Sequence, residues 1–169
     1  MRVSREQAAL NRDRIVECAA RLFRERGFEG VGVDAVMREA GLTHGGFYGH
    51  FGNKEQLVGE ACARAVAEFL SLWRPRGYAA LLDSYLSVAH LRNPGRGCVL
   101  AALGCELARQ SSGVQAAVRP ALEEMVLFLG EGERERGLLR CSLLVGGLVL
   151  ARNLDESVLE VIRTSLRDR

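Results

Sequence analysis

The sequence predicts an all-α fold in two parts, an N-terminal three-helix helix-turn-helix domain and a helical bundle that follows it. Apolar residues recur every three or four positions, which is the period of a helix, and few segments alternate as strands do. Only three prolines interrupt long stretches of alanine, leucine, arginine and glutamate, residues that favour helices. With 169 residues, 48% of them hydrophobic, the chain can bury a sizeable core. We place the helix-turn-helix domain at residues 1–52 and the bundle at residues 53–169.

The first helix is expected over residues 4–26, where apolar side chains share one face. That face holds Ile15, Cys18, Ala19, Leu22 and Phe23. Gly27 follows and can end the helix, because glycine adopts a left-handed conformation at little cost. This helix should pack behind the two shorter helices that come next.

Residues 33–51 are expected to form two short helices joined by a tight turn. The apolar face of the first is made by Val33, Val36, Met37 and Ala40. Gly41 can close this helix in a left-handed conformation. Thr43 is a suitable N-cap for the second helix, which should run from His44 to about Phe51.

The second helix should turn Phe47 and Phe51 inward and leave a small, flat outer surface. The outer positions are His44, Gly45, Tyr48 and Gly49. Glycine weakens a helix by roughly 1 kcal/mol relative to alanine, so Gly45 and Gly46 need a compensating advantage. Close approach of the backbone to DNA is one such advantage, and two short helices at this spacing are typical of helix-turn-helix proteins. Double-stranded DNA is therefore the first expected partner.

The segment 48–57, YGHFGNKEQL, resembles the DNA-binding domain of TetR-family transcriptional regulators. The family pattern runs aromatic, any residue, His or Tyr, Phe, two residues, Lys, Glu, any residue, Leu, and every position is met. The resemblance implies that Tyr48 and Lys54 contact DNA phosphates. The positions expected to contact DNA in the major groove are Thr43, His44 and Gly45, with His50 as a further candidate contact.

The resemblance covers roughly the first third of the chain and has one departure. The family often places Thr or Ser, as cap and phosphate contact, where this chain has Val31 and Gly32. Gly32 can still cap the helix, but it has no side chain to offer a phosphate. Each of these residues also has a simpler interpretation than DNA contact. Tyr48 can pack on a neighbouring helix, and the histidines can be ordinary surface residues.

The charge distribution distinguishes the same end of the chain. The formal net charge is +2, and residues 1–54 hold nine basic and seven acidic residues. Residues 55–169 hold fourteen of each, so the whole excess lies in the proposed DNA-binding part. Because this excess is small, specific binding must come from individually placed residues rather than from a basic tail.

A long helix is expected over residues 53–73, with Asn53 as its N-cap. Apolar residues recur every four positions along it, at Leu57, Ala61, Ala65, Phe69 and Trp73. The sequence RPRG at positions 74–77 then ends the helix. A helix that starts in the first part and ends in the second could transmit a ligand-induced tilt, as the resemblance to TetR-family regulators implies.

Five further helices are expected, over residues 78–91, 98–110, 113–129, 137–153 and 155–167. The resemblance implies that the last two pair with their copies in a second subunit and form a four-helix dimer interface. A homodimer also suits the physics, because two copies can occupy half-sites roughly 34–36 Å apart on DNA. The alternative is that these two helices only complete the core of one subunit.

The resemblance also implies a small-molecule effector bound inside the bundle. The large apolar and sulfur-bearing residues that could line its pocket are Phe69, Trp73, Tyr85, Cys105 and Met125. Glu106 and His90 are the polar candidates. Ordinary core packing is the alternative interpretation for each of these residues.

No enzyme, metal site or cofactor is predicted. The sequence has no Gly-rich phosphate loop, nucleophile elbow or carboxylate pair at catalytic spacing, and its five cysteines form no metal-ligand pattern with the three histidines. Two alternatives stay open. A helical thiol-dependent enzyme would use Cys98 or Cys105 with His90, whereas a protein-interaction module would keep the helix-turn-helix without binding DNA. Modification of Cys105 by an electrophile or oxidant could also release DNA.

We therefore expect a cytoplasmic, ligand-responsive transcriptional regulator, a repressor that a small molecule releases from its operator. Repression is taken from the resemblance alone. No signal peptide is expected, because Arg2, Arg5 and Glu6 interrupt the N-terminus and no apolar core follows. The apolar run 138–151 contains Arg140 and is short for a membrane span, so we interpret it as a buried helix.

Overall fold

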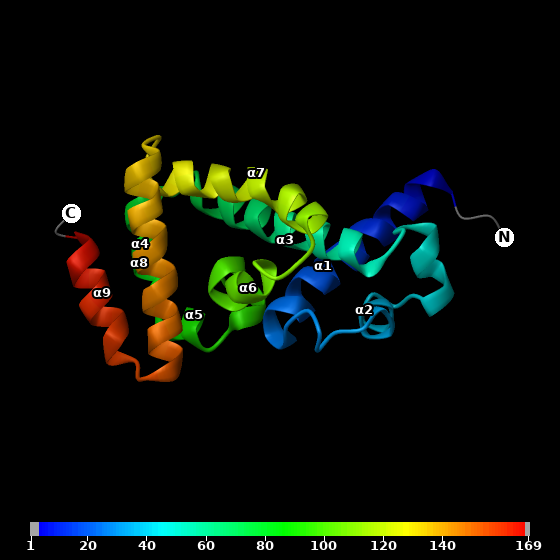
Figure 1. The fold of residues 1–169 in the computed structure, drawn as a ribbon, viewed down its shortest axis with the longest axis horizontal. Coiled ribbons are helices and arrows are strands. Elements are labelled where there is room, and N and C mark those ends of the chain that lie inside the picture. Colours follow the sequence, from blue (N-terminus) through cyan, green and yellow to red (C-terminus); the bar gives the residue numbers. More distant parts are fainter. Residues whose placement is uncertain (1–3, 168–169) are drawn as a thin grey trace.

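The computed structural model describes residues 4–167, which form nine α-helices and two 3₁₀ helices and contain no strand (Figure 1). The predicted all-α fold is confirmed. The elements are α1 (Arg5–Arg26), α2 (Val33–Glu39), η1 (His44–Gly49), α3 (Lys54–Trp73), α4 (Gly77–Tyr85), α5 (Val88–Leu91), η2 (Pro94–Arg96), α6 (Val99–Leu107), α7 (Ser112–Leu129), α8 (Arg134–Asn153) and α9 (Ser157–Arg167).

The first two helices end as their capping residues predict. Ser4 caps α1 by accepting a hydrogen bond from the backbone N–H of Gln7, and Gly27 closes the helix with φ of 76°. Gly32 precedes α2 in an extended conformation, and Gly41 follows the helix with φ of 70°. Both closing glycines therefore adopt the left-handed conformation that other residues rarely tolerate.

The second helix of the helix-turn-helix differs from the prediction, because it is a 3₁₀ helix that ends at Gly49 rather than an α-helix reaching Phe51. Three glycines in six residues give this segment little α-helix propensity, and it forms two turns of the tighter 3₁₀ helix instead. Phe47 and Phe51 still point inward as predicted, are 1% and 2% exposed, and stack with ring centroids 5.5 Å apart. The aromatic pair therefore anchors a short element that has few other packing contacts.

The long helix α3 connects the two parts of the molecule. Asn53 caps it by accepting a hydrogen bond from the backbone N–H of Gln56 at 2.8 Å. The helix packs against α1 near its beginning and lies alongside α7 over most of its length (Figure 1). Its predicted apolar positions face these neighbours, with Leu57, Ala61 and Ala65 buried.

Several boundaries in the second half differ from the prediction, and α6, for example, ends at Leu107 rather than near residue 110. The expected helix 78–91 is divided into α4 and α5, because Leu86 leaves the helical conformation and Ser87 caps α5 by accepting from the N–H of His90. Helix α8 begins at Arg134, three residues earlier than expected. The turn before it is therefore short, and Glu131 and Gly132 both take positive φ there.

Helices α7 and α8 cross with their backbones in direct contact. A Cβ atom added at Gly137 would lie 2.0 Å from the carbonyl oxygen of Val126, and one added at Gly130 would lie 1.9 Å from the carbonyl oxygen of Glu133. Real Cβ atoms do not approach backbone atoms this closely, so only glycine fits at either position. The crossing fixes the direction in which α8 leaves α7.

Helices α8 and α9 lie side by side at the end of the molecule opposite α2 (Figure 1). They approach closely at Gly147, where an added Cβ would be 3.0 Å from the Cγ1 atom of Ile162. The run 138–151 is only partly buried, which corrects the expectation of a buried helix. The large apolar residues that α8, α9 and their junction leave exposed are Leu138, Leu139, Val149, Leu150, Leu154 and Val161.

Replacing Gly137 by alanine should lower the free energy of unfolding by about 2 kcal/mol or more, because the methyl group would overlap the backbone of α7. Gly146→Ala is the matched control in the same helix, since no described atom lies within 4 Å of a Cβ at that position. It should be neutral or stabilising by up to about 1 kcal/mol. Urea unfolding followed by circular dichroism measures both. Equal effects of the two substitutions would contradict the backbone contact.

Candidate nucleic-acid interface and ligand cavity

The helix-turn-helix presents a continuous exposed surface at one end of the molecule. Thr43, His44, Gly45 and Tyr48 are all exposed, and the tyrosine ring is 66% accessible. The surface lies on η1, whose inner side is fixed by the buried Phe47. The structure thus brings four of the six predicted DNA-contact residues together on η1 and its N-cap, where they face outward.

His44 is held in place on this surface. Its Nδ1 atom pairs with the carboxylate of Asp34, the second residue of α2, and its ring meets the Tyr48 ring edge-on at 6.0 Å. His50 lies apart from this group, half-buried at the end of η1. The exposed face is therefore formed mainly by Thr43, His44 and Tyr48.

Lys54 makes an internal contact that the sequence did not predict. Its ammonium group donates to the carbonyl oxygen of Phe28 at 2.5 Å, across 26 residues of sequence. The carbonyl belongs to the turn that follows α1, where the regular helix hydrogen bonds have ended. Because an ammonium group has three N–H donors, two of them remain for an outside partner.

Glu106, a predicted polar residue of the ligand pocket, instead binds the same turn. Its Oε2 atom accepts a hydrogen bond from the backbone N–H of Phe28 at 2.7 Å. A Cβ atom at Gly27 would lie 2.7 Å from its other carboxylate oxygen. Glu106 therefore connects α6 to the end of α1 and does not line the cavity described next.

A cavity of about 670 Å³ opens between α1, α3, α4 and the segment that carries α5 and η2. Three of the five predicted pocket residues, Phe69, Trp73 and Tyr85, line it. Cys105 is exposed on α6 and Met125 is 2% exposed in the core, and neither reaches the cavity. Neither residue therefore lines this cavity, although both were predicted to line the pocket.

The different surroundings of Cys98 and Cys105 have a local cause. The prediction started a helix at Cys98, which would put Cys98 and Cys105 on one face two turns apart. In the structure α6 starts at Val99, and Cys98 precedes it in an extended conformation. Cys98 consequently turns into the cavity wall while Cys105 faces outward.

His90 lines the cavity but has both ring nitrogens engaged. Nδ1 lies 2.8 Å from the carbonyl oxygen of Tyr85, and Nε2 accepts from the backbone N–H of Cys98 at 3.0 Å. Burial lowers the pKa of His90, the Tyr85 carbonyl partly opposes this, and the nearby charge of Arg152 lowers the pKa further. The ring is therefore neutral with its proton on Nδ1, and it has no free nitrogen to activate the Cys98 thiol. This geometry argues against a thiol-dependent enzyme built on Cys98 and His90.

Arg24 is a cavity residue that the sequence analysis missed. It projects from α1 into the cavity wall, and its Nε atom donates to the carbonyl oxygen of Gly95 in η2 at 2.9 Å. Burial lowers the pKa of its guanidinium, an effect that the carboxylates of Glu68 and Glu25 oppose. No pattern in the sequence signals this placement, because it depends on a contact 71 residues away along the chain.

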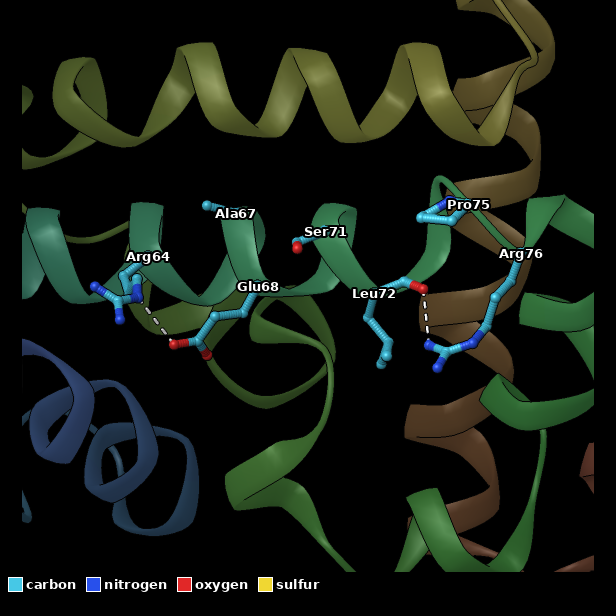
Figure 2. Close-up of a pocket in the computed structure, with 7 residues that line it drawn as sticks. All are labelled: Arg64, Ala67, Glu68, Ser71, Leu72, Pro75 and Arg76. Atoms are coloured by element: carbon cyan, nitrogen blue, oxygen red, sulfur yellow. Dashed lines mark hydrogen bonds and ion pairs between the residues drawn. The ribbon is translucent and has the colours of Figure 1, made fainter.

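A second depression of about 640 Å³ follows the solvent side of α3 and its end (Figure 2). Its lining residues all lie between Arg64 and Arg76. Figure 2 shows Arg64 reaching Glu68, at 3.0 Å, and Arg76 returning to the carbonyl oxygen of Leu72, at 2.8 Å. These polar groups satisfy one another on an open surface, so we assign no ligand to this depression.

Within residues 4–167, no group of three or more His, Cys, Asp and Glu side chains gathers in a way that could hold a metal ion. None of the described helices combines the length and the apolar character that crossing a bilayer requires.

Comparison with known proteins finds similarity between the N-terminal part of the chain and a family of regulators. Residues 15–61 match the family model described as bacterial regulatory proteins, tetR family. The HTH-type transcriptional repressor KstR2 of Mycolicibacterium smegmatis is 35% identical over 81 residues, which make up 48% of this chain and only 37% of that protein. The match to this curated relative therefore spans little more than a third of its length.

Two solved structures are similar over nearly the whole chain. A TetR transcriptional regulator from Chloroflexus aurantiacus has a TM-score of 0.73 and 26% identity, covering 96% of this chain and 95% of that one. AibR, solved in complex with isovaleryl coenzyme A and operator DNA, has a TM-score of 0.64 and 18% identity, covering 92% and 95%. The likeness to AibR shows the shared fold alone.

Replacing Lys54 by methionine should lower the free energy of unfolding by about 1–2 kcal/mol, because the Phe28 carbonyl loses a charged hydrogen-bond donor. Methionine keeps most of the side-chain volume, so lost packing contributes little. Arg109→Met, at an exposed cation beyond the end of α6, is the control and should leave stability within about 0.5 kcal/mol. Chemical denaturation measures the free energy of unfolding of each variant relative to the parent protein. If Lys54→Met matched the control, the contact with Phe28 would have no energetic role.

Proposed function

We propose that the chain is a transcriptional regulator of the TetR family, a ligand-responsive repressor that binds operator DNA as a homodimer. The exposed surface of η1, formed by Thr43, His44, Gly45 and Tyr48, is the observation that carries this proposal. We keep residues 1–52 as the DNA-binding part and residues 53–169 as the part for ligand binding and dimerisation. DNA as the target also implies a cytoplasmic protein.

The glycines of η1 support an approach to an outside partner. Neither Gly45 nor Gly49 has positive φ, and no described atom lies within 4 Å of a Cβ placed at either residue. The fold itself therefore does not require glycine at these positions. A bare backbone that can approach a DNA groove closely is a reason for both, and it agrees with the match to the tetR family model.

Tyr48 and Lys54 are the proposed phosphate contacts. The tyrosine ring stands outward with its hydroxyl available to donate to a phosphate oxygen, and Lys54 keeps two N–H donors beyond its bond to Phe28. His44 and Thr43 are proposed to contact base edges, and His50 is proposed to contact DNA from the end of η1. Lys54 would then serve the fold and the DNA contact at once.

Operator binding is tested with purified protein and DNA fragments that flank its own coding sequence, across a salt series. A specific complex should form with a Kd below about 10⁻⁷ M. Tyr48→Phe, which removes only the hydroxyl, should weaken it about 5- to 10-fold. Lys54→Met should reduce the slope of the logarithm of the binding constant against the logarithm of salt concentration by about one, because one phosphate contact is lost.

Tyr78→Phe is the matched control, because Tyr78 is a half-buried tyrosine in α4, which belongs to the bundle. It should leave operator affinity unchanged. Absence of any specific complex would overturn the proposed function and favour a protein-interaction module. Parent-like binding by both Tyr48→Phe and Lys54→Met would remove the phosphate contacts alone.

The exposed apolar residues of α8 and α9 support the homodimer. Leu139 and Leu150 are 48% and 49% exposed, and Val161 is 64% exposed. Clustered apolar side chains at one end of a molecule are typical of protein interfaces. This end lies opposite α2 (Figure 1), so pairing through it leaves both DNA-binding surfaces free.

Leu150→Glu should shift the protein from dimer to monomer, raising the dimer dissociation constant at least about 10-fold, because an unpaired carboxylate is costly to bury. Leu10→Glu, at a leucine of α1 that is 57% exposed, is the control and should remain dimeric. Sedimentation velocity measures the two species. A monomeric parent protein, or equal behaviour of both variants, would exclude α8 as the interface.

The cavity beside α3 supports response to a small molecule. It is bounded by α1 of the DNA-binding part and by α3, α4 and the α5–η2 segment of the bundle. A ligand there would touch both parts, which is the arrangement that coupling between two sites needs. The complex of AibR with isovaleryl coenzyme A and operator DNA shows that a protein of this fold binds both kinds of partner.

A further inference from the structure

We propose that the cavity beside α3 binds an amphipathic carboxylate, an apolar body carrying one carboxyl group, with the guanidinium of Arg24 as its ionic partner. The proposal rests on the proposed function, because it names the chemical class of the effector. It depends on three features of the cavity wall: an unpaired cation, an aromatic surface and a hydroxyl without a partner.

The cation is Arg24. Its Nε donor is used by Gly95, but among the described residues no carboxylate forms an ion pair with its guanidinium. A largely buried guanidinium without a counter-ion is costly, and a carboxylate can accept two parallel N–H donors from it. The two Nη groups of Arg24, for which no hydrogen bond or ion pair is found among the described residues, are therefore available to an anion in the cavity.

The neighbouring charges are mostly committed to one another. Arg21 pairs with Glu25 at 3.1 Å and also with Glu39, and Glu68 pairs with Arg64 at 3.0 Å. These contacts leave the carboxylates of Glu25 and Glu68 acting on Arg24 only from a distance, as the direction of its pKa shift indicates. An incoming carboxylate thus competes with no existing ion pair at Arg24.

The aromatic surface comes from Phe69 and Trp73 of α3, both half-buried, and from Tyr85 of α4. These rings favour an apolar or aromatic ligand body through burial of surface. Tyr85 is 4% exposed, and its hydroxyl has no hydrogen-bond partner among the described residues. Burial raises the pKa of Tyr85 well above its usual value, and the neighbouring thiol of Cys98 raises it further. A ligand oxygen that reached this hydroxyl would supply the missing partner.

The position of Arg24 also suggests how binding could reach the DNA. Arg24 belongs to α1, whereas Gly95 belongs to η2, so their hydrogen bond spans the contact between the two parts of the molecule. A carboxylate on Arg24 would place a negative charge at this contact. The ligand would then alter how α1 sits on η2, three residues before the turn that ends α1.

Trp73 provides a direct readout, because it is the single tryptophan of the chain and it lines the cavity. The full-length protein, without DNA, is titrated with 4-phenylbutyrate and octanoate and with the corresponding uncharged amides. Tryptophan fluorescence reports binding. Each carboxylate should bind about 10- to 100-fold more tightly than its amide, which is the range expected for a charged hydrogen-bonded pair.

Arg24→Met should remove this preference, so that carboxylate affinity falls to that of the amide while amide affinity stays within about twofold. Arg26→Met is the matched control, because Arg26 is exposed on the same helix and lies outside the cavity. It should bind both ligands as the parent does. Circular dichroism confirms that each variant is folded, and the comparison of acid with amide on the parent protein needs no variant at all.

Three results would overturn the proposal: equal affinity for acid and amide, no fluorescence change with any of the four compounds at millimolar concentration, or an unchanged preference in folded Arg24→Met. The titration contains no DNA, so its failure is separate from failure of operator binding. If the protein binds carboxylates through Arg24 but binds no operator, the carboxylate site stands and the proposed repressor function fails. If it binds an operator but shows no preference for carboxylates, the repressor function stands and this class of effector is excluded.

Discussion

The backbone of Phe28 joins three helices, and the relative placement of the two parts of the molecule depends on it. Its N–H donates to the carboxylate of Glu106 in α6, and its carbonyl accepts from the ammonium of Lys54 in α3. Its ring is 1% exposed and packs edge-on against Phe23 at 5.4 Å. Hydrogen bonds to charged groups are stronger than those between neutral groups, so one turn after α1 is fixed from two sides.

The DNA-binding surface and the ligand cavity both lie close to this turn. On one side, Lys54 is the first residue of α3, directly after the segment that carries η1. On the other side, Arg24 contacts η2 from the last turn of α1. A shift of α1 relative to η2 would therefore move the Phe28 turn, and with it the start of α3. This is a short physical route between effector and DNA, formed by few residues.

Periodicity and capping residues predicted the helices well, because both depend on neighbours in sequence. The ends of α1 and α2 at Gly27 and Gly41 followed from local backbone preferences alone. The break at Leu86 was missed because apolar periodicity continues through it. The early start of α8 was missed because residues 134–136 are all charged and give no apolar pattern.

Within the candidate sites, the sequence predicted the residues that a shared local motif carries and missed those that depend on distant contacts. Tyr48 and His44 are exposed on one element, as the motif implied. The internal bond of Lys54, the role of Glu106 in binding the Phe28 turn and the unpaired state of Arg24 each involve residues 26 to 78 positions apart. Such contacts follow from tertiary packing, which no pattern along the chain reports.

The three glycines of η1 have a further consequence for how an operator would be distinguished from other DNA. Thr43, His44 and Tyr48 are the side chains on this surface able to form hydrogen bonds, and Tyr48 is proposed to bind phosphate. So few groups can form little direct contact with base edges. Discrimination would then depend on the width of the groove and on how easily the duplex bends, properties that vary with base sequence at positions the protein does not touch. An operator of this kind would tolerate many single-base changes, because the protein would recognise the shape of the duplex more than the identity of individual bases.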